Sequence, residues 1–384
     1  MTASAAIAPG ATLGVLGGGQ LGRMFVHVAQ RLGYRCVVVD PDADSPAGRV
    51  AERHLRADYL DAAALNELAQ QAAAVTTEFE NVPADALRRL ANRVPVAPAA
   101  DAVAVCQDRA REKAVFQRCG VPCAPHAVID DEAALVAVSA ALLPGILKTA
   151  QLGYDGKGQR SVHDRDELAS AWRALGSVRC VLERRLELAR EISVVLARSS
   201  SGEVVSFAPF GNLHRDGILS VTHWPAPELD AALAAQADAA ARRIAIELGY
   251  VGVLCVEFFV LRDGTLCANE MAPRPHNSGH CTIDAADVSQ FEWQVRAMAS
   301  LPLIAPRAQA SAVMLNLLGD LWRDGAPPDW SRVLSLRGAA LHLYGKRDAR
   351  GGRKMGHVTL TAPTMAEADA IARDAAGQLG IAPW

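Results

Sequence analysis

The sequence lacks a strong excess of charge of either sign. Its 384 residues carry 39 lysines and arginines against 42 acids, which gives a formal net charge of −3. A balance this close to neutral provides no general attraction to nucleic acid or to an anionic membrane. We therefore expect no nucleic-acid partner and no membrane partner, and any recognition of phosphate must be local.

Paired cysteines and long apolar runs are missing as well. The eight cysteines show no C-x-x-C pair and no zinc-ribbon spacing, and several lie in apolar runs, where free cysteine behaves as a small hydrophobic residue. No stretch of about 18 apolar residues predicts a membrane span. The start, Met1 to Gly10, has no basic region and no long apolar core, so no signal peptide is predicted. These absences favour a cytoplasmic protein.

What remains is the composition of a globular protein, with 51% hydrophobic and 21% charged residues. The length predicts two or three domains. We place an α/β domain with a glycine-rich loop at 1–107, a small α+β domain with a flap loop (150–158) at 108–188, and a large domain built on an antiparallel sheet at 189–384.

The first domain opens with a glycine-rich turn. An apolar strand, Ala11 to Leu16, precedes Gly17, Gly19 and Gly22, which match G-x-G-x-x-G, and Asp40 ends the next strand. The pattern is typical of a dinucleotide site. A glycine turn into a helix N-terminus favours any anion, however, including the phosphate of a ribonucleotide. Both interpretations stay open from this motif alone.

Alternating segments extend this start into a doubly wound domain: strand Arg35–Val39, helix Asp61–Ala72, strand Ala74–Thr77 and helix Ala84–Ala91. Its third strand ends at Glu78, with Glu80 close behind. Ligands of such sheets bind beyond the carboxyl ends of the strands, so Glu78 is a candidate contact for a polar substrate. A capping or solvated role suits Glu80 equally well.

A long helix, Asp101 to Cys119, then carries Arg109 and Lys113 one turn apart on one face. The small domain that follows combines helix Asp131–Leu142, strand Gly145–Thr149, strand Arg160–Val162, helix Asp166–Leu175 and strand Cys180–Glu183. Lys148 lies inside one of these apolar strands. A buried lysine needs an anionic partner.

The loop between two of these strands reads QLGYDGKG from Gln151 to Gly158. Three glycines in six residues predict a flexible flap whose amides could close over phosphates. The loop is not a Walker motif, because Lys157 is followed by glycine. A plain mobile hairpin is the alternative.

The central feature of the large domain is an acidic hairpin. Two β-rich runs, Val251–Val260 and Thr265–Asn269, flank Asp-Gly at 263–264, which predicts a two-residue turn with positive φ at both positions. That turn sets Glu257 directly opposite Glu270, where like charges repel unless a cation lies between them. Mg²⁺ typically binds one or two carboxylates together with substrate phosphates. The alternative, acids that point into solvent, conflicts with the position of Glu257 inside an apolar strand.

The remaining segments complete the large domain: strand Glu191–Ala197, strand Val204–Pro209, helix Glu228–Leu248, helix Ser289–Ala299, strand Ser311–Leu317, strands Leu341–Tyr344 and Met355–Leu360, and helix Met365–Leu379. A lone loop histidine such as His214 is usually solvated or structural. His276 and His280 are four residues apart, but Pro275 and Gly279 disfavour a helix there and no glutamate follows His276, so zinc is disfavoured.

Between the last two strands, residues 346–354 carry five cations and one acid. In a chain of net negative charge this basic turn predicts a local anion site, with a solvated turn as the alternative.

Taken in order, GGGQLGRM, QDR-x-x-x-K, GYDGKGQ, the hairpin that runs into NEMAPRPHNSGH, and GRKMGH resemble the ATP-grasp carboxylases of the purine pathway, the N5-carboxyaminoimidazole ribonucleotide synthetases. The resemblance spans nearly the whole chain. It implies an ATP-grasp fold with a pre-ATP-grasp domain, a small flap domain and a large C-terminal domain. It also implies a homodimer that uses Mg²⁺, ATP and bicarbonate to carboxylate 5-aminoimidazole ribonucleotide through carboxyphosphate.

The resemblance also implies roles for individual residues. The implied magnesium ligands are Glu257 and Glu270. The catalytic candidates are Tyr154, Lys157, Arg274 and Lys354. The implied ATP site comprises Arg109, Lys148, Gly153, Tyr154, Asp155, Gly156, Lys157, Gly158, Glu183, Arg184, Arg185, Leu186, Glu191, His214, Asn269 and Glu270. The implied ribonucleotide site comprises Gly19, Gln20, Leu21, Glu78, His276, Asn277, Ser278, Lys346, Arg353 and Lys354. Family flaps often carry arginine where this chain has Lys157.

Three rival functions follow from the same motifs. A sister ATP-grasp enzyme that uses formate to make formylglycinamide ribonucleotide shares the hairpin and the basic turn. An NAD-dependent oxidoreductase would use the first glycine loop but gives the acidic hairpin no role. A catalytically inactive nucleotide-binding module conflicts with the intact Glu257, Glu270 and Lys148.

Overall fold

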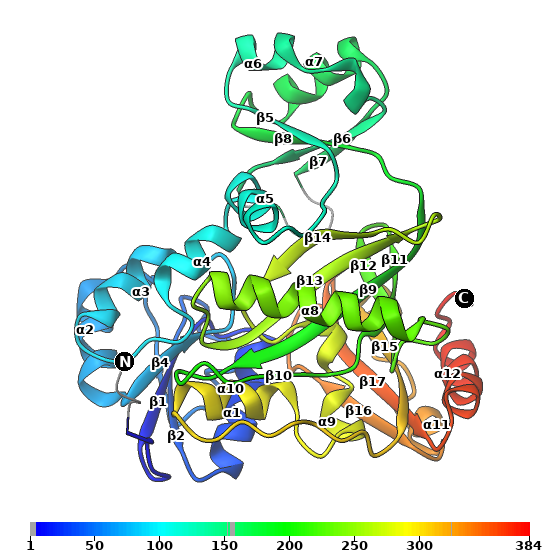
Figure 1. Ribbon diagram of the computed structural model, residues 1–384. Coiled ribbons are helices and arrows are strands. Elements are labelled where there is room, and N and C mark those ends of the chain that lie inside the picture. The colour runs from blue at the N-terminus through cyan, green and yellow to red at the C-terminus, as the bar shows by residue number, and fades with distance from the viewer. Residues whose placement is uncertain (1–4, 152, 154–157, 324) are drawn as a thin grey trace.

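The structure is a computed structural model that describes residues 5–151, 153, 158–323 and 325–384. Three sheets organise the described chain: a parallel sheet near the N-terminus, a small antiparallel sheet and a large antiparallel sheet. Figure 1 shows the small sheet and its helices standing above the other two units, to which the chain joins them at both ends. In the described part of the chain, no helix is both long and apolar enough to cross a bilayer.

The first unit is a doubly wound α/β domain, as predicted. Its sheet has the order β3-β2-β1-β4, with every pair parallel. The missed strand β3 makes Ala74–Thr77 the fourth strand and not the third. Its elements are β1 (Thr12–Leu16), α1 (Gln20–Arg31), β2 (Arg35–Val39), β3 (Arg53–Leu55), α2 (Ala62–Gln71), β4 (Ala74–Thr77), α3 (Ala84–Ala91) and α4 (Ala100–Cys106).

The small unit packs two helices on a four-stranded sheet of order β5-β8-β6-β7. The predicted helix 131–142 is wrong in extent, because α6 ends at Ala137 and a separate 3₁₀ turn follows. The elements are β5 (His126–Ile129), α6 (Glu132–Ala137), η1 (Ala140–Leu142), β6 (Gly145–Thr149), β7 (Gln159–Val162), α7 (Arg165–Ala174) and β8 (Cys180–Arg184).

The large unit is a nine-stranded antiparallel sheet of order β14-β13-β9-β11-β12-β15-β17-β16, with β10 paired to β9. Helices α8 and α12 cover one face, and α10 packs on the other. Its strands are β9 (Leu188–Arg198), β10 (Val204–Ser206), β11 (Phe210–Arg215), β12 (Ile218–Trp224), β13 (Gly252–Leu261), β14 (Leu266–Ala272), β15 (Ser311–Leu318), β16 (Ala339–Leu343) and β17 (Lys354–Ala362). Its helices are α8 (Ala231–Glu247), η2 (Asn277–Gly279), α9 (Thr282–Ala285), α10 (Gln290–Met298), η3 (Gly319–Leu321), α11 (Trp330–Leu334) and α12 (Met365–Leu379).

The predicted single helix from 101 to 119 is wrong. Helix α4 ends at Cys106 and α5 (Arg109–Arg118) starts anew, because the buried Asp108 accepts the amides of Ala110 and Arg111 as an N-cap. Phe116 of α5 packs in the core that α8 forms with β9, β13 and β14. The start of the predicted small domain therefore packs on the large sheet.

Candidate active site

Glu257 of β13 lies opposite Glu270 of β14, so the predicted acidic pair is confirmed. The predicted turn is wrong, because Leu261 and Thr265 close a longer connection in which Gly264 has positive φ and Asp263 does not. The register then shifts by one residue between Glu257 and Phe258. This β-bulge compensates for the longer turn and restores the opposition of the two acids.

Each acid of the pair has a basic neighbour. Nε2 of His276 lies 2.9 Å from Oε1 of Glu257, and Nη1 of Arg109 lies 3.0 Å from Oε2 of Glu270. Burial raises the pKa of Glu257, but the charges of His276, His214 and Lys354 outweigh burial and lower it.

The hairpin provides a ligand set suited to a hard divalent cation. Beside Glu270, the buried Oδ1 atom of Asn269 has no hydrogen-bond partner within the described residues. Two carboxylates and one amide oxygen are the ligand types that Mg²⁺ prefers. The residues present therefore fit the predicted magnesium site.

The predicted anionic partner of Lys148 is Glu183, on the neighbouring strand β8. Nζ of Lys148 lies 2.9 Å from Oε2 of Glu183, and Nζ of Lys113 lies 3.0 Å from Oε1. Burial would raise the pKa of Glu183, but the two ammonium groups lower it to about 2. Two cations share one carboxylate, so the cluster can bind a further anion such as a phosphate. Lys113 was not predicted to be a site residue, although its place one turn after Arg109 was the signal.

His214 lies on strand β11 and not in a loop, which corrects the prediction. Its Nδ1 atom is 2.7 Å from Oε2 of Glu191 on the adjacent strand β9. Burial lowers the pKa of His214, but the hydrogen bond to Glu191 and the charge of Glu257 raise it overall. His214 thus contacts Glu191 and acts electrostatically with Glu257, and its place in the implied nucleotide site stays a prediction.

The flap loop is described only at its base. The amide of Arg109 donates to the Ala150 carbonyl (2.9 Å), and the amide of Thr149 donates to the Gly158 carbonyl (2.8 Å). Gly153 is half-buried. The other predicted flap residues lie outside the described residues: Tyr154, Asp155, Gly156 and Lys157.

The predicted segment Arg184 to Leu186 lies where β8 leaves the small unit for β9. The side chains of Arg184 and Arg185 are exposed. Their amides donate to the carbonyls of Pro125 and Pro144. The main chain of this connection is therefore held in place while its two arginine side chains remain open to solvent.

At the glycine loop, internal carboxylates bind the free amides of the turn. Glu78 accepts the amides of Gly19 (2.9 Å) and Gly22 (3.0 Å), and Asp40 accepts the amide of Gly18 (2.7 Å). Burial raises the pKa of Glu78. Because these amides and Asp40 are engaged within the chain, the dinucleotide interpretation loses the groups that it requires.

The other two predicted residues of this loop differ from each other. Gln20, the first residue of α1, is half-buried and stays a candidate contact. Leu21 packs its side chain into the domain core, so its predicted place in the substrate site stays a prediction that concerns its main chain.

The loop after the hairpin links the first domain to the acidic pair. Arg274 forms an ion pair with Glu80. Burial raises the pKa of Glu80, but Arg274 lowers it to about 2, so this residue is neither a cap nor solvated. Oγ of Ser278 contacts Nδ1 of His276 at 2.9 Å. The buried amide side chain of Asn277 has no hydrogen-bond partner among the described residues, which suits a ligand contact.

The basic turn folds back toward the first domain. Arg347 pairs with Asp44 (2.8 Å), and Arg49 donates to the Gly345 carbonyl (2.9 Å). Within the turn, Lys346 donates to the carbonyl of Lys354 and Arg353 donates to that of Asp348, each at 2.8 Å. The charge of Lys354 also lowers the pKa of Glu257, so the turn reaches the hairpin electrostatically.

The predicted residues thus form two groups, one around Glu257 and Glu270 and one around Glu78 and Arg274, and the charge of Lys354 acts on Glu257 of the first group. Sequence reasoning missed the buried Glu112 of α5. Its Oε1 accepts the amide of Met271 at 2.5 Å, and burial, with the charge of Glu270, raises its pKa to about 8. An acid next to Lys113 in a helix that faces the hairpin was the available signal.

Comparison with known proteins decides the family. Residues 10–107 match the ribonucleotide synthetase preATP-grasp domain, 114–291 the ATP-grasp domain and 312–371 the phosphoribosylaminoimidazole carboxylase C-terminal domain. The N5-carboxyaminoimidazole ribonucleotide synthase of Brucella melitensis is 45% identical over 361 residues, 92% of this chain and 97% of that protein. The chain belongs to the N5-carboxyaminoimidazole ribonucleotide synthase family.

Solved structures of the N5-carboxyaminoimidazole ribonucleotide synthase family agree over nearly the full length. The synthetase of Thermus thermophilus is 40% identical with a TM-score of 0.89, over 97% of this chain and 99% of that chain. The synthase of Aspergillus clavatus, in complex with ADP and 5-aminoimidazole ribonucleotide, is 32% identical with a TM-score of 0.88, over 96% and 98%. The predicted ATP-grasp fold is confirmed.

Proposed function

We propose that this protein uses ATP and bicarbonate to carboxylate 5-aminoimidazole ribonucleotide, giving N5-carboxyaminoimidazole ribonucleotide, ADP and phosphate in purine biosynthesis. The observation that carries the proposal is the opposed pair Glu257 and Glu270, flanked by Arg109. The identity of the substrates is inferred from those named for its relatives.

On this proposal, Glu257 and Glu270 hold magnesium together with Asn269. Bound there, the ion would neutralise charge on the ATP phosphates. Lys148 and Lys113 would contact the same phosphates, because together they carry one more charge than the carboxylate that they share. Arg109 would join them from beside Glu270. Glu191 and His214 would bind the ribose side of the nucleotide.

The reaction needs two transfers. An oxygen of bicarbonate attacks the γ-phosphorus of ATP, the bond to ADP breaks, and carboxyphosphate forms; the amine of the ribonucleotide then attacks the carbonyl carbon and phosphate leaves with its electron pair. Charge spreads over phosphoryl oxygens in the first transfer, so fixed cations stabilise it. Arg274 is the cation best suited to this role, since Glu80 fixes its guanidinium. Lys354 is assigned with it, and Tyr154 and Lys157 stay predictions.

The ribonucleotide itself is assigned to the second group. Its phosphate would lie at the basic turn with Lys346, Arg353 and Lys354, and its ribose near Glu78 and the glycine loop. We also propose a homodimer, which sedimentation of the purified protein would test directly.

The test is an assay of ADP release with each substrate omitted in turn. We expect release to require both 5-aminoimidazole ribonucleotide and bicarbonate. A matched arm supplies glycinamide ribonucleotide with formate. Activity in that arm alone would show that the protein is a formate-using enzyme. ADP release without any acceptor would show that it is only an ATPase.

A further inference from the structure

The loop that carries Arg274 and His276 has little regular structure of its own. It contains one short 3₁₀ turn, Asn277–Gly279, between strand β14 and helix α9. A loop of this kind keeps its side chains in one direction only if its main chain is bound elsewhere. The partner that binds it must therefore be found outside the loop.

That partner is Gln290, the first residue of α10, whose side chain is 0% exposed. Its Oε1 accepts the amide of His276 at 2.8 Å, and its Nε2 donates to the carbonyl of His276 at 2.7 Å. One carboxamide thus binds both main-chain groups of a single residue, as a neighbouring strand would. The same Nε2 lies 3.1 Å from Nδ1 of His280, four residues further on.

The surroundings hold Gln290 tightly. Its own amide donates to Oγ1 of Thr282 (3.1 Å), and that hydroxyl donates to the Gly279 carbonyl (2.6 Å). A Cβ atom on Gly279 would come within 2.6 Å of Oε1 of Gln290, so the loop backbone packs directly on the carboxamide. Neither side can shift without breaking the hydrogen bonds to His276.

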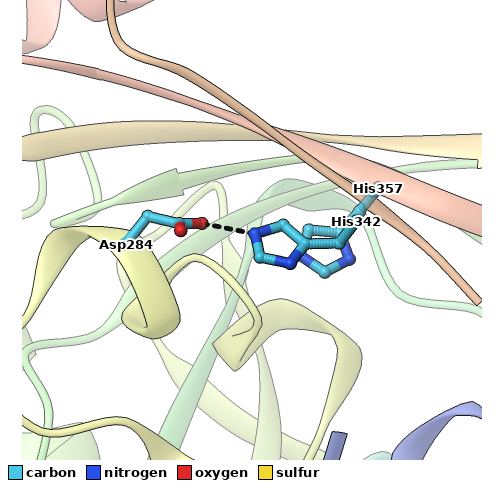
Figure 2. A group of neighbouring side chains, drawn as sticks. All are labelled: Asp284, His342 and His357. Atoms are coloured by element: carbon cyan, nitrogen blue, oxygen red, sulfur yellow. Dashed lines mark hydrogen bonds and ion pairs between the residues drawn. The ribbon is translucent and has the colours of Figure 1, made fainter.

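The far end of the same segment is anchored by a second group, shown in Figure 2. Asp284 of α9 accepts a hydrogen bond from His342 of β16 at 2.9 Å, and His357 stacks on His342 with ring centroids 4.4 Å apart at 11°. The three side chains bring potential metal ligands within 4.8 Å of one another. However, ring-nitrogen lone pairs lie in the ring planes, and two nearly parallel planes do not converge on one ion. The group anchors the segment and is no metal centre in this geometry.

We propose that Gln290 is a positioning residue for the reaction: by binding the main chain of His276, it fixes the direction from which His276 faces Glu257 and holds the neighbouring Arg274 beside Glu80. His276 reaches Glu257 from this clamped position, and Ser278 supports its other ring nitrogen. The kinetic consequence rests on the proposed function. The binding of the His276 main chain by Gln290, which we call the clamp, does not depend on that function.

The chain offers a matched control one turn along the same helix. Gln294 is 2% exposed, accepts the amide of Val253 (2.7 Å) and donates to Oγ1 of Thr76 (2.9 Å). It is an equally buried carboxamide that holds main chain, but its hydrogen bonds within the described chain join the first domain to β13 and reach no residue of the site. Gln290→Met and Gln294→Met therefore remove the same kind of group at a similar cost in stability.

We expect Gln290→Met to lower kcat by about 10²-fold with little change in the KM for ATP, since a displacement of about 1 Å in a reacting group can cost that much. Gln294→Met should keep kcat within about twofold of wild type. Gln290→Glu is a milder variant: a neutral carboxyl can accept from and donate to His276, whereas the ionised form cannot donate. Its kcat should therefore fall with rising pH relative to that of wild type. Equal kcat losses in the two methionine variants would overturn the proposal.

Hydrogen exchange separates this inference from the proposed function. The amide of His276 should exchange at least tenfold faster in Gln290→Met than in wild type or Gln294→Met, as measured by mass spectrometry on peptides that cover 274–282. If wild type released no ADP with the proposed substrates, the function would fail while this measurement still decided the clamp. Unchanged exchange in Gln290→Met would refute it.

Discussion

At the scale of single residues, the site is defined by buried charges that bind one another. Glu183 lies between Lys148 and Lys113, both almost fully buried, and its low pKa measures how strongly the two ammonium groups favour the ionised carboxylate. A buried ion pair is strongly destabilised when one partner is removed, because a charge is left without compensation. These three residues therefore couple the stability of the small unit to the proposed nucleotide site.

The shifted pKa of Glu183 predicts a pH dependence of stability. Its folded pKa, about 2, lies below its ordinary value of 4.5. The contribution of the carboxylate is therefore fully present above about pH 4.5 and is lost as the pH falls toward 2. A shift of this size corresponds to roughly 3 kcal/mol.

We expect Glu183→Gln to lower the free energy of unfolding near pH 6 by about 3 kcal/mol and to lose less stability than wild type between pH 5 and 2.5, as measured by urea unfolding. Glu187→Gln, at an exposed position four residues later, is the control and should follow wild type. A parallel pH dependence in Glu183→Gln and wild type would show that the two lysines do not depend on this acid.

The sequence could predict that such partners exist but not which residues they are. A lysine inside an apolar strand requires an anion, and this argument identified Lys148 correctly. Its partner Glu183 lies 35 positions away, and the partner of Arg109 lies 161 positions away. These partners come together only when strand β8 pairs with β6 and when α5 packs on β14. Both are tertiary contacts that local sequence patterns do not encode.

At the scale of elements, the acidic hairpin shows how a correct prediction can rest on a wrong local step. The pattern of apolar residues and Asp-Gly predicted that β13 and β14 pair and that Glu257 faces Glu270. The turn is one residue longer than predicted, and the bulge near Asn269 absorbs the difference. The helix break at Asp108 was missed for a similar reason. An aspartate within a helical pattern can be a solvated helix residue or an N-cap, and only the burial of Asp108 beside Arg179 shows that it is a cap.

The hairpin predicts the effect of removing one acid. Glu270→Ala should lower kcat by on the order of 10³-fold or more, because the proposed magnesium loses a carboxylate ligand worth several kcal/mol in the transition state. Folding should be intact, since the ion pair that Arg109 loses is partly exposed and the mutation also removes a repulsive charge from the acidic pair. Circular dichroism and the ADP-release assay measure the two effects.

Asp263→Ala, in the exposed turn of the same hairpin, is the matched control and should retain activity within about twofold. Near-normal turnover in Glu270→Ala would remove the metal argument. A loss of the same size in both variants would mean that the hairpin is merely destabilised.

At the scale of the whole molecule, the three units meet through different kinds of contact. The first domain shares an apolar core with α10 of the large unit and is also tied to that unit by hydrogen bonds and ion pairs, among them Gln294 with Thr76 and Arg274 with Glu80. The small unit is joined to the rest by charges at one end of α5, where Lys113 meets Glu183 and Asp108 meets Arg179. Figure 1 shows it standing apart from the large sheet. The order and class of the units followed from the sequence, but these contacts did not.

This arrangement predicts how the nucleotide changes stability. MgATP on the proposed site would contact Lys148 in the small unit and Glu257 and Glu270 in the large one, so it would bind the folded protein and not the unfolded chain. At a concentration of about 100 times Kd, it should add roughly 2.7 kcal/mol to the free energy of unfolding, which corresponds to a rise in Tm of several degrees. Differential scanning calorimetry measures the shift.

ATP with a chelator should give a smaller rise in Tm than MgATP, and the difference between the two rises is the part that magnesium supplies. That difference should vanish in Glu257→Gln, whereas Glu187→Gln should retain it. If the difference survived in Glu257→Gln, the ion would have to be held elsewhere, and the opposed carboxylates would need another explanation.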